Sequence, residues 1–297
     1  MNNDKRQYLK IKKQKKIKMK TFVTLLMAAI FGLANIQTAS SQDIHDILRK
    51  FGQAVDKYKN LEYDFQSKER RRNGSYITTI GHFKVQEGSQ KKVSADLSEP
   101  DNAKIFWKKG DNNNKASVKL GRLPYVNLAL TNGKFLAKSH HTIDNSGFGL
   151  PKHTIMKIYN DRKAEINEAV VMKGNVTFDG HKCLHIEIND KNHGTTSYTV
   201  KDGENLISIA KAKAINQMQI LELNPDIKNY FDVDAGDVIT IPNSFGTKIT
   251  IYFDPQLYLP RYFKVEDNKG IVGEYKHLNL NVNATFDEND FTKDGFE

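Results

Sequence analysis

The sequence predicts an α+β protein in which an antiparallel sheet curves around or against a small number of helices. Apolar and polar residues alternate in many short runs, which is the pattern of strands with one buried face. Asn-Gly and Asp-Gly pairs stand between such runs and favour the tight turns of antiparallel hairpins. Helical spacing of apolar residues is confined to a few stretches, so most of the chain's body is expected to be strand.

The first element of the body is predicted to be an amphipathic helix over about residues 43–58. Its apolar residues recur at three- and four-residue steps and would form one stripe. They are Ile44, Ile47, Leu48, Phe51 and Val55. Strands are then predicted at 61–65 and 77–85, with Asn73-Gly74 as a tight turn between extended runs.

The middle of the body is expected to contain further strands and one more helix. Asn132-Gly133 is predicted to be the turn of a hairpin that joins residues 126–130 to residues 135–137. Residues 153–166 are predicted to be helical, with Ile155, Ile158 and Tyr159 on one face. The remaining strands are expected between 168 and 190, with Asp179-Gly180 as a turn, and at 249–253, 262–265 and 271–280.

The positive charge of the chain is concentrated at its N-terminus. Nine basic residues and one acidic residue lie in residues 1–42, which leaves only +2 of the formal charge of +10 for the remaining 255 residues. A near-neutral body gives no electrostatic reason to expect nucleic acid as a partner. The single Cys, Cys183, excludes a disulfide framework within one chain and a cysteine-rich zinc module.

Residues 1–42 have the order of a secretory signal peptide. A basic lead precedes an apolar stretch over 21–36, and small residues precede an expected cut at Gln42. Cleavage there predicts an exported protein, periplasmic or associated with the cell envelope, with no integral membrane span left. A retained anchor helix is the alternative, although about 20 apolar residues are needed to cross a bilayer. The start codon could encode Met1 or Met19.

One stretch, residues 197–243, departs from the order of strands and turns. Extended residues at 198–200 are followed by a short helix behind Asn205, a residue type that caps helix N-termini. A second helix over 216–223 ends before Asn224-Pro225, since proline disfavours helical geometry in the residue before it. A second strand closes the unit, so the order is strand, helix, helix, strand.

The same residues resemble a LysM domain from end to end. The run Tyr-Thr-Val-Lys-Asp-Gly-Glu-Asn-Leu at 198–206 corresponds to the family's Y-T-V-K-x-G-D-T-L. Leu-Asn-Pro at 223–225 and Ile-Pro at 241–242 match its later motifs. The resemblance implies a βααβ module that binds glycans containing N-acetylglucosamine, such as peptidoglycan. Glu204-Asn205 stands where the family usually has Asp-Thr, beside the expected glycan groove.

By carry-over from that family, the glycan would lie between two loops of the module, one after the first strand and one after the second helix. The expected binding residues are Gly203, Glu204, Asn205, Leu206, Asn224, Pro225, Asp226 and Ile227. Backbone N–H and C=O groups with a few apolar contacts are sufficient for neutral sugars, so neither a charged cluster nor a metal or cofactor is expected. Leu206 and Ile227 could instead be only core residues, and Gly203 and Pro225 only turn residues.

The module is expected to be an insertion in a discontinuous host domain, residues 43–196 and 244–297. Its two strands pair antiparallel and bring its ends together, so it can replace a hairpin loop. The host tail resembles that of LolA- and LolB-like periplasmic carriers, with Ile-Thr-Ile-Tyr-Phe-Asp at 249–254, Leu-Pro at 259–260 and a D-x-x-G turn at 267–270. That resemblance implies an incomplete antiparallel barrel whose helices cover an apolar concavity suited to a lipid or lipoprotein.

Two further groups of residues could carry chemistry. His181, Cys183, His185 and Glu187 alternate along a predicted strand, so all four would face one side and could approach a metal. A half-exposed strand face with Cys183 as a small apolar residue is the simpler interpretation, and a cysteine-hydrolase pair with His185 is the remaining one. His140-His141 could line a site or belong to a structural loop.

Three hypotheses for function follow. The first is an exported, non-enzymatic, cell-wall-associated protein that attaches to peptidoglycan, or another N-acetylglucosamine polymer, through the LysM domain. The second is a periplasmic carrier of lipid or lipoprotein that the LysM domain only localises. The third is a wall-modifying enzyme, for which the sequence contains no phosphate loop, dinucleotide fingerprint or H-E-x-x-H motif.

Overall fold

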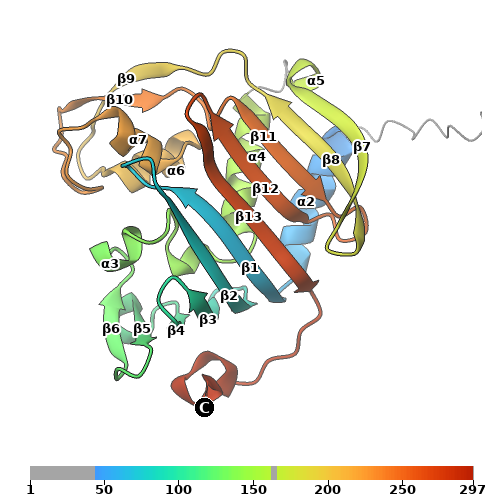
Figure 1. Cartoon of the computed structure of the whole chain (residues 1–297), viewed down its shortest axis with the longest axis vertical. Helices are drawn as coiled ribbons and strands as arrows, with labels where there is room; N and C mark the ends of the chain where they lie inside the picture. The colour runs from blue at the N-terminus through green and yellow to red at the C-terminus, as the bar shows by residue number, and fades with distance from the viewer. Residues whose placement is uncertain (1–43, 162–165, 297) are drawn as a thin grey trace, which may run out of the picture. The chain divides into compact units, whose positions relative to one another are not determined.

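A computed structural model describes residues 44–161 and 166–296 of the chain. The predicted signal peptide, residues 1–42, lies outside the described residues. The main element is a sheet in the order β6-β5-β4-β3-β2-β1-β13-β12-β11-β8-β7, in which each strand pairs antiparallel with its neighbours (Figure 1). The strand bounds are β1 Asn60–Arg70, β2 Tyr76–Gln86, β3 Lys92–Glu99, β4 Ala103–Lys108, β5 Lys115–Leu120, β6 Val126–Ala129, β7 Val170–Phe178, β8 His181–Asn189, β11 Lys248–Phe253, β12 Pro260–Asp267 and β13 Gly270–Asn281.

Two series of hairpins meet in the middle of this sheet, where β1 pairs with β13. From β1 the chain runs outward strand by strand to β6 at one edge, and β7 forms the other edge. The hairpin turns use the residues that the sequence indicates. Gly74 and Gly180 both have positive φ, 81° and 72°, which a residue without a Cβ adopts at little cost. The predicted fold class, an open and curved antiparallel sheet with helices, is confirmed.

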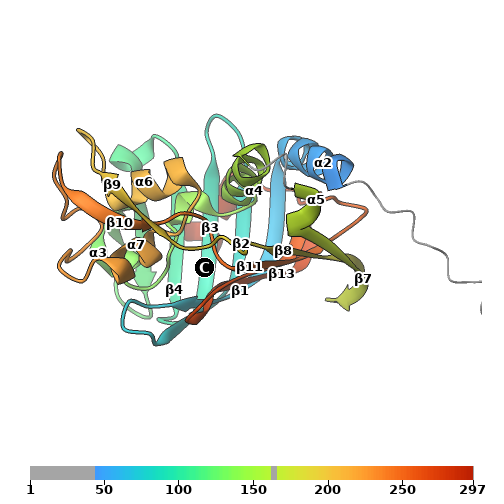
Figure 2. The same ribbon diagram turned by 90° about the horizontal axis from the view of Figure 1, so that it is seen from above.

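Helices cover one face of the sheet (Figure 2). Helix α2 (Ile44–Lys57) buries the predicted apolar stripe, and Phe51 meets Phe253 of β11 edge to face, with ring centroids 5.6 Å apart. Helix α4 (Gly149–Asp161) lies beside α2 on the same face. Burial of one large apolar side chain stabilises a fold by roughly 1.5–3 kcal/mol. The stripe therefore explains both why α2 forms and where it docks.

Aromatic side chains in the centre of the sheet tie it to the segment before α4. Tyr63 of β1 stacks on Phe83 of β2, with ring centroids 5.6 Å apart. The backbone N–H of Gly147 donates to the Tyr63 hydroxyl over 3.0 Å, and burial raises the pKa of that hydroxyl. This bond leaves the buried phenol satisfied. It also fixes the loop from which α4 begins.

Two of the predicted elements differ from the structure. Asn132-Gly133 is not a hairpin turn, because the Asn132 side chain accepts from the Lys134 backbone N–H and caps helix α3 (Gly133–Leu136). The same residue type favours tight turns and helix N-caps, and Leu136 gains burial as a helical residue. The helix predicted at 153–166 begins earlier, as α4, and a separate short helix, α5 (Ile166–Ala169), follows.

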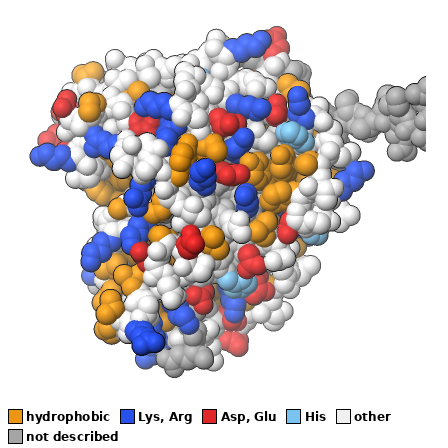
Figure 3. Space-filling view, viewed as in Figure 1, with side chains coloured by type: hydrophobic (Ala, Val, Ile, Leu, Met, Phe, Trp, Pro, Cys, Tyr) orange, Lys and Arg blue, Asp and Glu red, His pale blue; other side chains and the backbone are white. Residues whose placement is uncertain are grey.

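Charges on the sheet face seen in Figure 1 are mixed in sign (Figure 3). Three lysines on neighbouring strands lie near acidic side chains within 4 Å of their Nζ atoms: Lys248 with Glu187, Lys264 with Glu266, and Lys276 with Glu274. These residues are only partly exposed, and surface pairs of this kind contribute little stability, about 0–1 kcal/mol each. Their main consequence is that this face carries no extended field of one sign that would attract a polyanion.

Candidate functional site

Between β8 and β11 the chain leaves the main sheet and forms a separate βααβ unit. It consists of β9 (Thr195–Thr199), α6 (Leu206–Lys213), α7 (Gln217–Leu223) and β10 (Val238–Pro242), and β9 and β10 form their own two-stranded sheet. On either side of the unit, β8 and β11 pair directly, with Asn189 opposite Lys248. The unit therefore occupies the position of a hairpin connection, and residues Asp43–Glu297 together form one compact body.

The unit has a hydrophobic core of its own. Its buried members are Val200, Leu206, Ile209, Ala210, Ile215, Met218, Ile220, Leu221, Tyr230, Ile239 and Ile241, and Leu136 of α3 completes the cluster. Leu136 is only 7% exposed. Since α3 belongs to the sheet domain by chain position, the core of the βααβ unit extends across its boundary with the sheet domain.

The first predicted loop is shaped by its own polar side chains. Gly203 has a φ of 73°, and the Glu204 carboxylate accepts from the Lys201 backbone N–H and the Tyr198 hydroxyl. The bond from the Lys201 N–H holds the pKa of Glu204 below its ordinary value. Asn205 accepts from the backbone N–H groups of residues 207 and 208, and Ser208 bonds back, so the pair forms a capping box. Glu204-Asn205 thus keeps the helix start well formed.

The second predicted loop is anchored by one amide side chain. The Asn224 Nδ2 donates to the carbonyls of Ile220 and Thr240, both over 2.7 Å, and its Oδ1 accepts from the Thr240 N–H over 2.9 Å. The end of α7 is thereby fixed to β10. Pro225 and Asp226 are exposed, and Ile227 is half-buried against the core of the unit.

A backbone hydrogen bond connects the first loop to the segment that follows the second. The Leu206 N–H donates to the Tyr230 carbonyl over 2.9 Å. Leu206 has no exposed surface and lies in the core of the unit, so it supports the loop from within and presents no surface to a ligand. Among the predicted binding residues, Gly203, Pro225 and Asp226 are the exposed ones, while Glu204, Asn205, Asn224 and Ile227 are half-buried.

Arg72, in the turn between β1 and β2, contacts the second loop and was not among the predicted residues. One Nη donates to the Ile227 carbonyl over 2.7 Å, and the other donates to the Asn224 and Pro225 carbonyls over 3.1 and 2.6 Å. The sequence signals a turn at Asn73-Gly74, but no local pattern indicates which surface that turn meets.

Two residues earlier, Arg70 joins the sheet to α7 through a buried ion-pair cluster. Its guanidinium contacts both carboxylate oxygens of Glu222, over 2.8 and 2.9 Å, and both of Asp267, over 2.8 and 2.5 Å. Burial alone would raise the pKa of Asp267, but the hydrogen bonds from Arg70, the Lys269 backbone and Gln219 outweigh it and lower that pKa. All three charged groups are at least nine-tenths buried, so the unit and the sheet are held in fixed register.

His140 forms a second polar connection at the same junction, which settles the predicted choice between a site and a structural loop in favour of structure. Its Nε2 faces the Arg70 carbonyl over 2.7 Å and therefore donates. Its Nδ1 faces the Asn216 Nδ2 over 3.0 Å and therefore accepts, because the Asn216 Oδ1 is used to cap α7. Both ring nitrogens of His140 therefore have hydrogen-bond partners. The Gln217 side chain also donates to the His140 carbonyl.

The neighbouring His141 lies beside Tyr275, whose hydroxyl is 3.3 Å from its Nε2. Burial lowers the pKa of His141 to about 4. The Tyr275 hydroxyl donates to the fully buried Glu69, which also accepts from the His140 backbone N–H over 3.0 Å. Each of these groups has a partner within the protein, as buried polar groups in stable cores do.

The residues His181, Cys183, His185 and Glu187 do lie on β8, but they differ in environment. Cys183 is fully buried, and burial raises the pKa of its thiol to about 11. His181 is exposed, and the His185 Nε2 lies 3.4 Å from Glu187. Within the described ranges no group of three or more His, Cys, Asp or Glu side chains is arranged to hold a metal.

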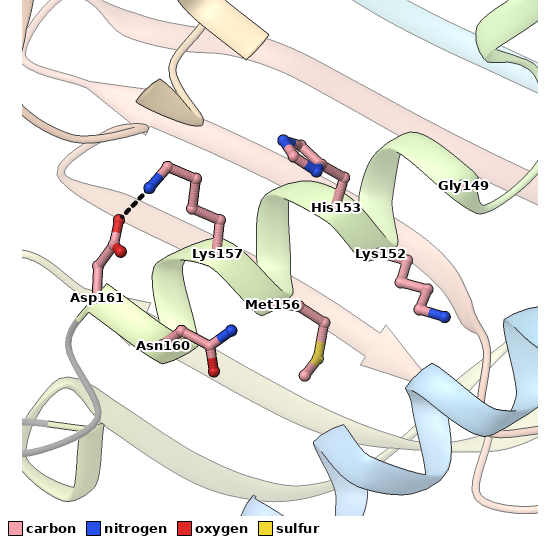
Figure 4. Close-up of a pocket in the computed structure, with 7 residues that line it drawn as sticks. All are labelled: Gly149, Lys152, His153, Met156, Lys157, Asn160 and Asp161. Atoms are coloured by element: carbon pink, nitrogen blue, oxygen red, sulfur yellow. Dashed lines mark hydrogen bonds and ion pairs between the residues drawn. The ribbon is translucent and has the colours of Figure 1, made fainter. Parts of the chain in front are cut away.

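A surface hollow of about 500 Å³ lies along α4 (Figure 4). Its lining residues all come from this helix: Gly149, Lys152, His153, Met156, Lys157, Asn160 and Asp161. Two of its basic groups are already paired, Lys157 with Asp161 over 2.8 Å and Lys152 with Asp56 over 2.6 Å. The hollow therefore offers no unpaired charged cluster to a ligand.

Comparison with protein families matches residues 198–242 to the LysM domain. The βααβ unit is thus a LysM domain, as its motifs predict. A comparison with curated proteins gave no match. Among the helices in the described part of the chain, none is long and apolar enough to cross a membrane.

Solved structures that match most of the chain include bacterial proteins of low sequence identity. MucB shares 11% identity over 85% of this chain and 63% of its own, with a TM-score of 0.41, so this chain spans less than two thirds of its length. A putative outer membrane lipoprotein-sorting protein domain from Vibrio parahaemolyticus has 12% sequence identity to this chain. The match covers 84% of this chain and 96% of that domain, with a TM-score of 0.35. A LolA superfamily protein from Nitrosomonas europaea has 8% sequence identity to this chain. The match covers 84% of this chain and 98% of that protein, with a TM-score of 0.32.

Proposed function

We propose that this chain is an exported, non-enzymatic protein of the cell envelope that binds peptidoglycan, or another polymer of N-acetylglucosamine, through its LysM domain. The observation that carries the proposal is the match of residues 198–242 to that domain. The glycan would lie against the two loops, residues 203–206 and 224–227. Backbone groups and the exposed Gly203 and Pro225 suit an uncharged amphipathic sugar chain, for which ordered polar groups with few apolar contacts are sufficient.

The junction with the sheet gives this binding a consequence. Because Arg70 and His140 fix the LysM domain to the sheet domain through buried contacts, attachment to a glycan would hold the whole body in one orientation. A module on a flexible linker would instead leave the attached domain free to turn. The sheet domain is therefore proposed to be presented in a set direction from the wall.

Sedimentation with purified peptidoglycan tests the proposal. The wild-type chain is expected to sediment with the polymer, and Gly203→Val is expected to reduce the bound fraction, since a β-branched residue strains the loop at a φ of 73°. Gly110→Val is a matched control, because Gly110 has a φ of 85° in a turn of the sheet domain and neither position has an atom within 4 Å of an added Cβ. Failure of the wild-type chain to sediment would contradict the proposal.

A second candidate function, a carrier of lipid or lipoprotein, is favoured by one observation. A row of half-buried aromatic side chains crosses the helix-covered face of the sheet, with neighbouring ring centroids 6.3–6.4 Å apart: Phe245, Phe263, Tyr275 and Phe65. Such a row could accept an acyl chain. Native mass spectrometry of the purified chain tests this function, and co-purified lipid that Phe263→Asp abolishes would support it.

A further inference from the structure

The carbonyl oxygens of the second LysM loop already have a donor, and it comes from the other domain. Arg72 donates to the carbonyls of residues 224, 225 and 227 over 2.6–3.1 Å. Its guanidinium thus bonds to backbone oxygens rather than to a carboxylate. Guanidinium N–H groups are strong, charged donors in a fixed fork, so this contact is stronger than the same bonds from a neutral donor.

The turn that carries Arg72 is built without help from the LysM domain. The Arg71 N–H donates to the Ser75 carbonyl, the Gly74 N–H donates to the Arg71 carbonyl, and the Asn73 side chain accepts from the N–H and hydroxyl of Ser75. Asn73, Gly74 and Ser75 are exposed. Arg72 can therefore leave the loop while the turn keeps its shape.

Arg70 keeps the two domains together whether or not Arg72 is docked. Its ion pairs with Glu222 and Asp267 are buried at the end of β1, two residues before Arg72, whereas the Arg72 side chain is only partly buried. The Arg70 ion pairs therefore keep Arg72 at a high effective concentration beside the second loop. The Arg70 contacts thus form the stable part of the junction, and the Arg72 contacts can exchange independently of them.

A sugar chain in the proposed groove would need the same oxygens. The N–H and hydroxyl groups of N-acetylglucosamine are donors, and the carbonyls of residues 224, 225 and 227 are acceptors of the second loop, beside the exposed Asp226 carboxylate. A guanidinium bound across all three fills the space in front of them. Resting on the proposed function, we infer that Arg72 is an internal competitor of the glycan, so its side chain must swing away before the second loop is fully available.

With competition of this kind, the apparent association constant is the intrinsic one multiplied by the fraction of molecules in which the loop is free. Removal of the side chain should therefore tighten binding. The probe is the tetramer of N-acetylglucosamine, titrated into the full chain by isothermal calorimetry. Arg72→Ala is expected to bind it about fivefold or more tightly than wild type. Arg72→Lys, which keeps the charge but has no fork of donors, is expected to lie between the two.

Arg49→Ala is the matched control, since Arg49 is an exposed arginine of α2 paired with Asp46, and its loss should leave the dissociation constant unchanged. If Arg72→Ala binds the tetramer no more tightly than wild type does, this inference is wrong but the proposed function stands. Weaker binding by Arg72→Ala would make Arg72 part of the glycan site. Absence of binding in both chains overturns the proposed function and this inference with it. Circular dichroism confirms that the variants are folded.

Discussion

Arg70 of β1 and Glu222 of α7 form a two-point ion pair at 2.8 and 2.9 Å across 152 residues of sequence, with 3% and 6% of their side chains exposed. Asp267 completes the cluster from the other side of the guanidinium. Buried charges of this kind are costly to leave unpaired, although the complete cluster need not stabilise the fold more than apolar residues would. The pair therefore fixes how the LysM domain and the sheet meet.

Arg70→Ala is predicted to destabilise the protein by about 3–5 kcal/mol, because Asp267 would remain buried without its guanidinium partner and Glu222 would keep only Lys269, 3.4 Å away. Urea unfolding followed by Trp107 fluorescence measures the change. Arg49→Ala, which removes an exposed arginine, should change the free energy of unfolding by no more than about 0.5 kcal/mol. Equal effects of the two substitutions would show that the cluster has no special role.

Leu136→Ala is predicted to cost about 2–4 kcal/mol, since this residue of α3 lies in the core of the LysM domain. Leu123→Ala is its control, because Leu123 is 62% exposed. Thermal unfolding of both variants gives the comparison. If α3 packs as described, only Leu136→Ala lowers the melting temperature, and a silent Leu136→Ala would place α3 outside the core.

The stability of the protein is predicted to fall as the pH decreases below about 6.5. Burial lowers the pKa of His277 to about 3, whereas an unfolded histidine titrates near 6.5. A histidine with a depressed pKa in the folded state binds its proton preferentially in the unfolded chain, so the stability it contributes is present above pH 6.5 and is lost progressively down to about pH 3. The expected slope is about 1.4 kcal/mol per pH unit for each such group.

His277→Phe tests that assignment. His277 lies among aromatic rings, with centroids 4.7–5.5 Å from those of Tyr63, Phe65 and Phe148, and its Nδ1 has no hydrogen-bond partner among the described residues. A phenyl ring should fill the space. It should also reduce the slope of unfolding free energy against pH, between pH 6 and pH 4, by about 1.4 kcal/mol per pH unit, which corresponds to one proton. An unchanged slope would assign the acid sensitivity to other groups, such as His141.

Cys183 is predicted to be unreactive in the folded protein. It is fully buried, and burial raises the pKa of its thiol to about 11, so the thiolate that attacks reagents is scarce at neutral pH. A disulfide reagent should release almost no chromophore from the native chain and one equivalent after denaturation. Rapid labelling of the native chain would reopen the interpretation of Cys183 and His185 as a reactive pair.

The sequence predicted those helices and turns that depend on residues close together in the chain. The stripe from Ile44 to Phe51 defines α2, and the Gly-containing turns at residues 74 and 180 define their hairpins. Asn132 was assigned wrongly because the same side chain can stabilise a turn or cap a helix, and burial of Leu136 decides between them.

The contacts that join the two domains could not be predicted from the sequence in the same way. Arg70 and Arg72 meet partners more than 150 residues away, and nothing in the run Arg70-Arg71-Arg72 distinguishes a clamped guanidinium from a solvated one. For the LysM loops, the family motif indicates where the loops lie. The structure adds that Glu204 and Asn205 are engaged in shaping the first loop.

Binding of N-acetylglucosamine polymers by the two LysM loops is tested by titrating the isotope-labelled chain with the N-acetylglucosamine tetramer and following the backbone amide chemical shifts. If these loops bind the sugar, saturable shifts are expected at residues 203–206 and 224–227, together with a change at Arg72. Shifts confined to other parts of the chain, or none at millimolar sugar, would contradict this binding.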